Sequence, residues 1–376
     1  MRTEVETTTW GKIGIVAFYA YFSIHMLMKA FSYDHGDNIY KIFFVMSLFF
    51  WGVKMITTTY RLREVFWISV LMATGLMLSV ITRQNTWLLL FMTISGMKNC
   101  RFDILTQLAV YIRTIALIIL IAGSVIGIYD IGAKTKVDAD YVQTSVYSFA
   151  MGEPNTAFLT VFLTLILLLY YNYKKLNVWW FLGTTAIALI FYKLTFCRTG
   201  IAVFFFCWVL IVFEKWAKDR KIKFLLVLSV PVGALFSLCT MLLYNENNSL
   251  MHRMNHFVSG RIYIMNTYFR DQGVSLFPRT QEQFYTSYHG LIDNAYMFVF
   301  LYGGVFIAAF FFVLLLKTQW KLYCGGHHKE LVMIAAMALY GVLEQFVMNG
   351  FMNLYVLLCG ILLYPGLLEA RKTKDN

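Results

Sequence analysis

Long apolar stretches joined by short polar connections make up most of this chain. Many of these stretches approach the roughly 20 residues that a helix needs to cross the hydrocarbon of a bilayer. The pattern predicts an all-α polytopic integral membrane protein with about twelve transmembrane helices and a single transmembrane domain over residues 1–376. The predicted spans are 12–30, 39–58, 65–82, 86–97, 103–128, 155–171, 178–196, 199–213, 223–244, 291–315, 331–348 and 351–368.

Composition supports this class and excludes a sizeable water-soluble domain. Hydrophobic residues make up 59% of the chain and charged residues 14%, and the mean hydropathy is +0.63. Soluble domains are usually about 45–50% apolar and about 25% charged. The first apolar stretch has no small-residue cleavage site, so we expect a retained span and not a signal peptide.

The net charge of +12 serves mainly as an orientation signal. Basic residues gather in alternate connections, and the positive-inside rule places those connections and both termini in the cytoplasm. Nucleic acid is not needed to explain the charge. The basic clusters are Arg61 and Arg63, Lys98 and Arg101, Lys174 and Lys175, Lys215 to Lys223, Lys317 to Lys329, and Arg371 to Lys374.

Two longer connections then face the outside, at 129–154 and 245–290. Long loops on a rigid scaffold are where function concentrates, so we expect chemistry at the outer face. We find no internal repeat of the kind common in secondary transporters. The six cysteines show neither a disulfide framework nor zinc-ligand spacing.

Arginines are the first candidates for that chemistry. Arg198 lies in a short outer turn between two apolar spans, either as a fixed cation for an anionic head group or as a snorkelling side chain. Arg261 and Arg270 are nine residues apart, which places them on opposite faces of a regular helix, so one is a surface charge or the helix breaks between them. The pair Ser259-Gly260 predicts a turn or cap that aims this segment.

We prefer Arg261 as the ligand of an anion, because a guanidinium group binds phosphate oxygens through two parallel hydrogen bonds. Arg253 and Arg279 are interpreted as solvated loop charges. His289 and Asp293 are four residues apart, so they share a face if a helix begins there. Together they could take a proton from an attacking hydroxyl, or Asp293 could simply cap the span with His289 at the interface.

Two ionisable residues lie deep in predicted spans. Arg113 is inside 103–128, and Glu344 is inside 331–348, with Asn349 and Asn353 following it. Such residues are candidates for function or for pairing within the membrane. We therefore hypothesise a salt bridge between Glu344 and either Arg113 or Arg198.

Five short motifs together resemble one known family, the Wzy-type polysaccharide polymerases of the O-antigen ligase and polymerase superfamily. The motifs are "GEPN" (152–155), "CRTG" (197–200), "SGR" (259–261), "DNAYMFVFLYGG" (293–304) and the series Glu344, Asn349, Asn353. Their order and topology cover nearly the whole chain. The O-antigen ligases share the same plan. The resemblance implies a GT-C-like membrane fold with a large external loop.

The resemblance also implies an activity. It implies inverting glycosyl transfer without metal or cofactor at the outer face of the bacterial cytoplasmic membrane, between oligosaccharide repeat units carried on undecaprenyl diphosphate. Arg198 and Arg261 would hold the donor pyrophosphate, and His289 or Asp293 would act as base. Implied partners are the lipid-linked donor and acceptor, membrane lipid, a chain-length regulator and a flippase, and no nucleic acid.

The chain departs from the family at two places. Relatives often have "GFxHPN" before the sixth span, where this chain has "AMGEPN", with Glu153 ahead of the retained Asn155. A family arginine just upstream is missing, and Arg113 or Arg270 would have to replace it. The ligases and many relatives have histidine before the later asparagine, where this chain has Asp293-Asn294.

Two other classes compete with the polymerase. A lipid-linked oligosaccharide flippase would line a midplane cavity with polar residues, whereas polar residues here gather at the outer end of the spans. A purely structural partner in a polysaccharide assembly has no need to keep Arg198, Arg261 and Asp293 facing one compartment.

Overall fold

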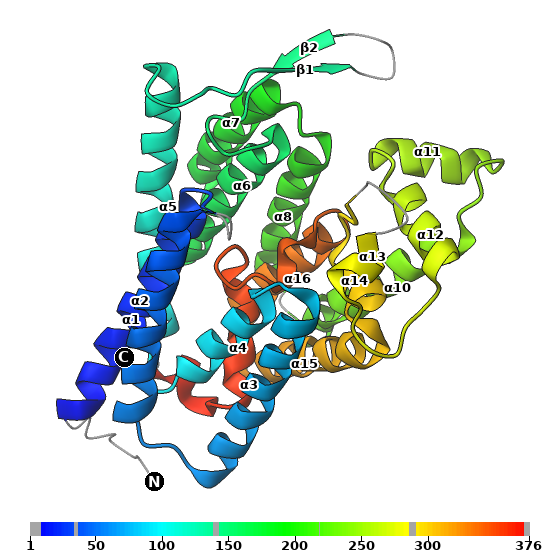
Figure 1. Ribbon diagram of the computed structural model, residues 1–376. Coiled ribbons are helices and arrows are strands. Elements are labelled where there is room, and N and C mark those ends of the chain that lie inside the picture. The colour runs from blue at the N-terminus through cyan, green and yellow to red at the C-terminus, as the bar shows by residue number, and fades with distance from the viewer. Residues whose placement is uncertain (1–8, 34–36, 138–142, 218, 286–290, 372–376) are drawn as a thin grey trace. The chain divides into compact units, whose positions relative to one another are not determined.

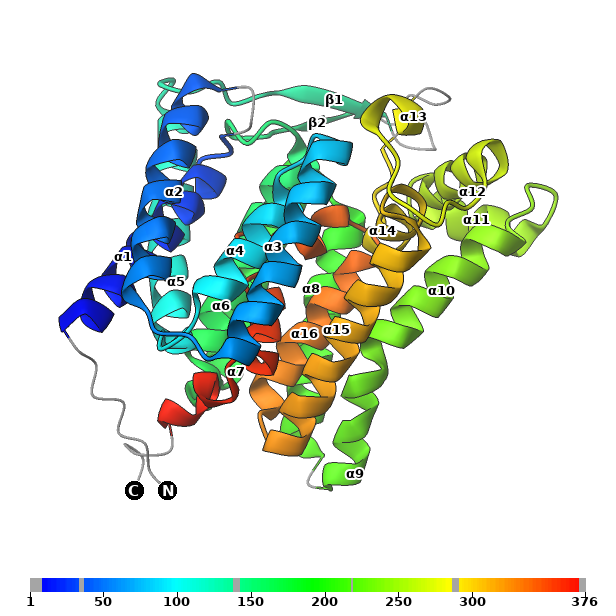
Figure 2. The same ribbon diagram turned by 60° about the horizontal axis from the view of Figure 1, so that its bottom comes forward.

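The computed structural model describes residues 9–33, 37–137, 143–217, 219–285 and 291–371. Helices dominate this part of the chain (Figure 1 and Figure 2). Among the described residues, nine helices are long and apolar enough to cross a membrane. The protein is therefore an all-α polytopic membrane protein, as the hydropathy pattern predicts.

The chain divides into two compact units. The first comprises residues 1–65, 95–204 and 364–376. Within it α1 packs against α2 and α5, and α6 packs against α5 and α7. Its elements are α1 (Thr9–Ala30), α2 (Asn38–Thr57), α5 (Phe102–Val125), β1 (Lys134–Val137), β2 (Gln143–Val146), α6 (Pro154–Tyr171), η1 (Tyr173–Lys175), α7 (Val178–Thr195) and η5 (Pro365–Arg371).

The second unit comprises residues 66–94 and 205–363. Within it α10 packs against α12, α14, α15 and α16. The helices α3 and α8 begin in the first unit, and α4 ends in it. The elements of the second unit are α3 (Leu62–Thr82), α4 (Thr86–Gly96), α8 (Arg198–Trp216), α9 (Arg220–Lys223), η2 (Phe224–Leu228), α10 (Ser229–Leu243), α11 (Ser249–Phe257), α12 (Arg261–Gln272), α13 (Gln281–Tyr285), α14 (Ala295–Tyr302), α15 (Gly304–Gly325), α16 (His328–Gly341), η3 (Gln345–Met348) and η4 (Leu354–Leu362).

Several threonine hydroxyls inside the spans form hydrogen bonds within their own helix. Thr57, Thr74 and Thr82 each donate to the carbonyl four residues earlier, at 2.7–2.8 Å. Apolar surroundings offer these hydroxyls no water, so the back-bond lets a polar residue occupy a span at small cost. Apolar periodicity is thus enough to build these helices even where threonine interrupts it.

Four of the predicted spans differ in the structure. The stretch 291–315 is divided at Gly303 into α14 and α15, and α15 continues to Gly325. The other three form shorter elements. The stretch 86–97 becomes the 11-residue α4, and 351–368 becomes mainly η4. The stretch 331–348 is helical only as far as Gly341. The backbone N–H groups of Leu343 and Glu344 both donate to the carbonyl of Tyr340 at 2.9 Å, which closes the last turn. Glu344 therefore follows the helix in extended backbone instead of lying inside a span.

The connection 129–154 contains a feature that the sequence did not suggest. Lys134–Val137 and Gln143–Val146 pair as an antiparallel hairpin, with Lys134 opposite Val146 and Val137 opposite Gln143. In its described part, 245–285, the second connection contains three short helices, α11, α12 and α13.

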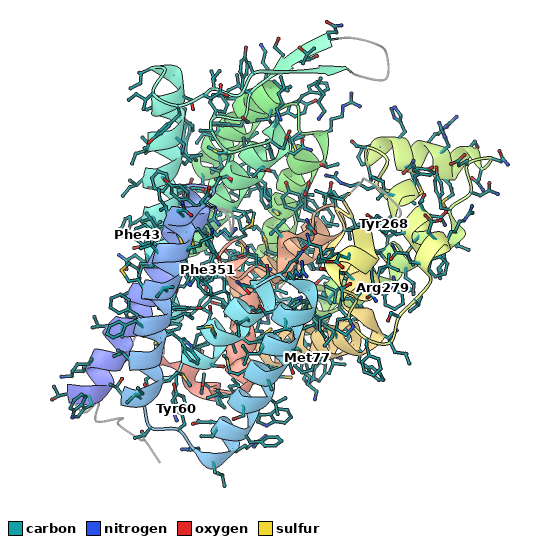
Figure 3. The ribbon with its side chains drawn as sticks, in the orientation of Figure 1. Phe43, Tyr60, Met77, Tyr268, Arg279 and Phe351 are labelled. Carbon is teal, nitrogen blue, oxygen red and sulfur yellow. The ribbon has the colours of Figure 1, made fainter. Side chains whose placement is uncertain are left out.

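Arg279 corrects one prediction for this second connection, because it is not a solvated loop charge. Its Nη2 donates to the carbonyls of Gln272 and Gly273 at 2.7 and 3.0 Å, and its Nη1 donates to the carbonyl of Leu301 at 3.2 Å. Figure 3 labels Arg279 among the side chains. These carbonyls belong to the ends of α12 and α14, where helix carbonyls have no partner within the helix. One guanidinium thus joins two helix ends.

We expect Arg279→Met to lower the free energy of unfolding by about 2 kcal/mol, because methionine keeps the apolar stem but leaves three carbonyls without their donor. The measurement is the midpoint of thermal unfolding in detergent. Arg270→Met removes the same charge from an exposed position on α12 and is the matched control. Equal midpoints for the two variants would contradict this role for Arg279.

Candidate functional site

The turn between α11 and α12 positions the preferred arginine. Ser259 and Gly260 both have left-handed backbone, with φ of 57° and 84°. Gly260 N–H donates to the carbonyl of Asn255 at 2.8 Å, which ends α11, and α12 begins at once with Arg261. The left-handed region is easy for glycine, so Gly260 suits its position, whereas Ser259 has a Cβ and adopts this region at a cost.

Asn255 supplies the cap that the sequence assigned to Ser259-Gly260. Its Oδ1 accepts a hydrogen bond from Tyr263 N–H at 2.9 Å, in the first turn of α12. Its Nδ2 donates to the hydroxyl of Tyr244 at 3.3 Å, directly after α10. Asparagine is a good acceptor for an orphan N–H at a helix start, but its position six residues upstream of Arg261 gave no signal in the sequence.

Arg261 lies between two carboxylates within the second unit. Its Nη2 donates to Glu344 Oε1 at 2.7 Å, and its Nε donates to Asp293 Oδ2 at 3.4 Å. The side chains of Arg261, Glu344 and Asp293 are 7%, 16% and 34% exposed. The guanidinium is therefore buried, Glu344 is its close partner, and Asp293 is the more accessible carboxylate. We call these three residues the arginine–carboxylate cluster.

The hypothesis about Glu344 is corrected here. The sequence proposed Arg113 or Arg198 as its partner, and the structure gives it Arg261, which is 83 residues away in the chain. A buried guanidinium needs a carboxylate because desolvation without a partner costs several kcal/mol. With all three groups ionised, the arginine–carboxylate cluster carries one net negative charge.

Burial dominates the electrostatics of both carboxyl groups, which lie outside the nine candidate spans. Desolvation raises the pKa of Glu344 from its ordinary 4.5 to about 7, and the Arg261 guanidinium offsets part of that rise. Desolvation also raises the pKa of Asp293, again opposed by Arg261. Each carboxyl is thereby a better proton acceptor than an exposed one, which is what a general base near neutral pH requires.

Asn294 fixes the backbone that carries the two carboxylates. Its Oδ1 accepts from Met297 N–H at 2.9 Å and so caps α14. Its Nδ2 donates to Ser237 Oγ on α10 at 2.9 Å and to the carbonyl of Val342 at 2.7 Å. Asp293 is the preceding residue, and Glu344 follows Val342 by two. One buried amide thus holds both carboxylate segments against α10.

The remaining candidates near this site have other surroundings. His289 lies outside the described residues. The helix α12 does not break between Arg261 and Arg270. Arg261 is buried and Arg270 is exposed on the opposite face, so Arg270 is a surface charge. Asn349 Oδ1 accepts from Phe351 N–H at 3.0 Å, which shapes the turn that follows η3.

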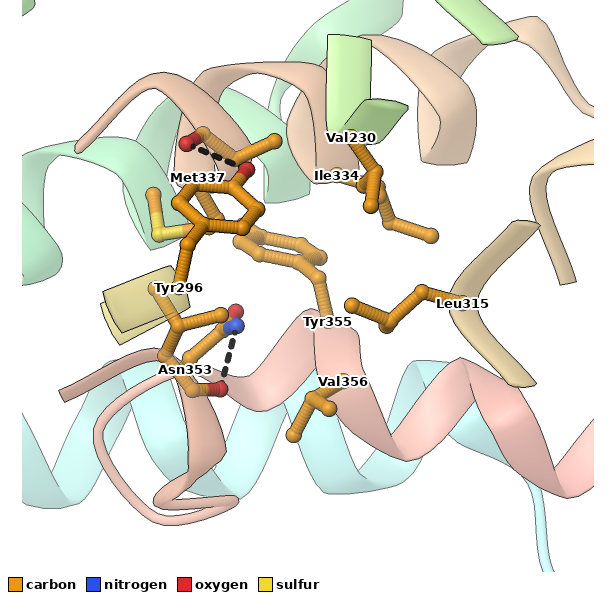
Figure 4. A pocket seen from close by; sticks show the side chains of 10 residues that line it. Val230, Tyr296, Leu315, Ile334, Met337, Asn353, Tyr355 and Val356 are labelled. Carbon is orange, nitrogen blue, oxygen red and sulfur yellow. Dashed lines mark hydrogen bonds between the residues drawn. The ribbon is translucent and has the colours of Figure 1, made fainter. Parts of the chain in front are cut away.

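Asn353 helps to line a small apolar cavity within the second unit (Figure 4). Its Nδ2 donates to the carbonyl of Val347 at 2.9 Å, and across the cavity Tyr296 donates to the carbonyl of Ala338 at 2.8 Å. The space of about 10 Å³ is at the lower limit for one water molecule. It is a packing feature and offers no room for a substrate.

In the first unit the predicted residues lie apart in the chain and have different surroundings. Arg198 begins α8, with its guanidinium 5.0 Å from the ring centroid of Phe196, whose left-handed backbone ends α7. Arg113 is buried in α5. Glu153 is exposed and pairs with Lys134 of the hairpin at 2.6 Å, a surface ion pair of small energetic value. Asn155 is exposed in the first turn of α6.

The geometry thus assembles a buried cation and two carboxylates with raised pKa values from three segments that are distant in the chain. Strongly perturbed carboxyls beside a fixed charge are typical of functional sites, although structural ion pairs show them as well. Comparison with protein-family models, with curated proteins and with solved structures finds no match to this chain. The function is therefore inferred from the residues and the geometry of the site.

Proposed function

We propose that this protein is a bacterial glycosyltransferase that polymerises oligosaccharide repeat units carried on undecaprenyl diphosphate. The observation that carries the proposal is the arginine–carboxylate cluster, in which a buried guanidinium is joined to a carboxylate that is one-third exposed. Transfer from a lipid diphosphate needs a cation for the leaving group and a base for the attacking hydroxyl. This cluster holds both kinds of group within one unit.

Arg261 acts on the leaving group. As the anomeric C–O bond of the donor breaks, negative charge develops on the departing diphosphate, and a preorganised guanidinium stabilises it without a metal. The long contact of 3.4 Å to Asp293 is the weaker of its two bonds. We infer that a diphosphate oxygen replaces Asp293 at Arg261, whereas Glu344 at 2.7 Å keeps the side chain in place.

Asp293 acts on the acceptor. Once it is released from Arg261, its carboxylate accepts the proton of the acceptor hydroxyl as that oxygen forms the new bond to the anomeric carbon with inversion. The raised pKa of this buried carboxyl favours the transfer. Binding of the donor thereby activates the base, which couples the two halves of the reaction. His289 remains a second candidate for the base from the sequence alone.

Arg198 and Arg113 remain proposed pyrophosphate ligands on the strength of their charge and of the "CRTG" motif that contains Arg198. Arg270 is exposed, which favours a role in solvent over one in the site. Glu153 and Asn155 are proposed only as supporting residues at the start of α6. The proposal places the reaction at the outer face of the cytoplasmic membrane, in line with the positions of the basic clusters.

The test uses the purified full-length protein in proteoliposomes with undecaprenyl-diphosphate-linked single repeat units as the only substrate. We expect a ladder of longer lipid-linked chains that persists in a metal chelator and is lost in Arg198→Ala. Growth only when a separate acceptor is added would indicate a ligase. Passage of repeat units across the bilayer without elongation would indicate a flippase and would overturn the proposal.

A further inference from the structure

α11 has three distinct faces, and two of them are exposed in the part of the chain that the structure describes. Met251, Met254 and Asn255 are partly buried and face the rest of the second unit. Leu250 and Phe257 are seven residues apart, so they share one edge of the helix. They are 62% and 60% exposed. Two large apolar side chains on one edge of a nine-residue helix need a partner that is not water.

The third face of α11 is basic. His252, Arg253 and His256 are all exposed, and α11 contains no acidic residue. On a helical projection Arg253 lies beside the apolar edge of Leu250 and Phe257, whereas His252 lies more than a quarter turn away from it. An apolar edge next to a basic face that contains an arginine is the pattern of a helix that rests in a lipid interface.

The chain holds α11 at the end of a membrane span. The candidate span Lys221–Leu243 ends with Leu242 and Leu243, both well exposed, so its apolar surface continues to its last residues. Residues 244–248 follow, and Asn245 to Asn248 are exposed. The hydrogen bond from Asn255 Nδ2 to the hydroxyl of Tyr244 then ties α11 back to the residue directly after that span. Figure 2 shows α11 at this end of α10.

We propose that α11 is an interfacial helix that docks on the anionic lipid head groups around the end of α10. Leu250 and Phe257 enter the boundary between head groups and acyl chains, and Arg253 contacts lipid phosphate. Charge complementarity and the attachment to α10 favour a lipid surface over a protein partner. The inference concerns the membrane alone, so it holds for an enzyme and for a transporter alike.

Docking of α11 has a consequence for the arginine–carboxylate cluster. Asn255 of α11 caps α12 through Tyr263 N–H at 2.9 Å, and α12 begins with Arg261. The turn is closed by two further hydrogen bonds, in which the N–H groups of Ser259 and Gly260 donate to carbonyls of α11. The lipid surface therefore orients the helix that presents Arg261.

The test measures the depth of spin labels in the full-length protein reconstituted into vesicles of phosphatidylglycerol and phosphatidylcholine. Cys239 and Cys324, which are exposed, are replaced by serine. Single labels at Leu250→Cys, Phe257→Cys and His252→Cys then occupy exposed positions that need no repacking. We expect oxygen to reach the labels at 250 and 257 several-fold more readily, relative to a water-soluble nickel complex, than the label at 252.

Three outcomes would overturn the proposal. Equal access of the nickel complex to all three labels would place α11 in water. Protection of positions 250 and 257 from both reagents would place them against protein, such as a second copy of the chain. The role of lipid charge is tested in vesicles of phosphatidylcholine alone, where the labels should lie less deep than in vesicles that contain phosphatidylglycerol. Arg253→Gln should remove this difference in depth between the two kinds of vesicle. No effect of lipid charge would refute docking on anionic lipid.

Discussion

Replacement of Arg261 by lysine is expected to reduce chain growth by about 100-fold or more, with single lipid-linked repeat units accumulating. The guanidinium uses Nε for Asp293 and Nη2 for Glu344. A lysine ammonium has three N–H donors, but they share one nitrogen on a flexible stem. It therefore does not reproduce the two fixed donor directions by which Nη2 holds Glu344 while Nε is free to receive a diphosphate oxygen. The measurement is the lipid-linked product ladder from cells that carry the variant.

Arg270→Lys is the matched control, since it makes the same substitution on the exposed face of the same helix. Its ladder should equal that of the wild type. Both variants must accumulate in the membrane to the wild-type level, because a lower amount of protein would by itself reduce the product ladder. An unchanged ladder in Arg261→Lys would remove this residue from the chemistry and direct attention to Arg198.

Much of the fold could be predicted from hydropathy because a span is a local property. A stretch such as 103–128 needs only its own residues to satisfy its backbone, and it forms α5 close to the predicted bounds. The prediction for 331–348 was wrong in its second half, because the helix ends at Gly341 and its last turn is closed by hydrogen bonds to the carbonyl of Tyr340. The hairpin at Lys134–Val137 was missed because each strand has only four residues and no clear alternation.

The candidate site was predictable by residue type but not by pairing. Arg261, Asp293 and Glu344 were each identified as an ionisable residue in or beside an apolar segment. Arg261 is 32 residues from Asp293 and 83 residues from Glu344 in the chain, and no local sequence pattern predicts pairing over such separations. The same reason explains why Arg279 was interpreted as a loop charge, since its carbonyl partners include Leu301 of another helix.

The pH dependence of stability provides a second large effect, through Glu344. Folding raises the pKa of Glu344 from 4.5 to about 7, so the folded state keeps this proton over a range in which the unfolded state has lost it. Between these pH values the folded state binds more protons, and the free energy of unfolding therefore falls as the pH rises. The shift corresponds to about 3 kcal/mol of stability that is present below pH 4.5 and lost by about pH 7.

Glu344→Gln cannot titrate, so the midpoint of its thermal unfolding in detergent should fall less between pH 5 and pH 7 than that of the wild type. The amide still accepts a hydrogen bond from Arg261, which limits the loss of packing. Asp271→Asn, an exposed carboxyl on α12, is the control and should keep the wild-type slope. If Glu344→Gln also kept that slope, the guanidinium would be holding Glu344 ionised throughout. Glu344 would then be a permanent counter-ion of Arg261, and a diphosphate would face stronger competition for that arginine.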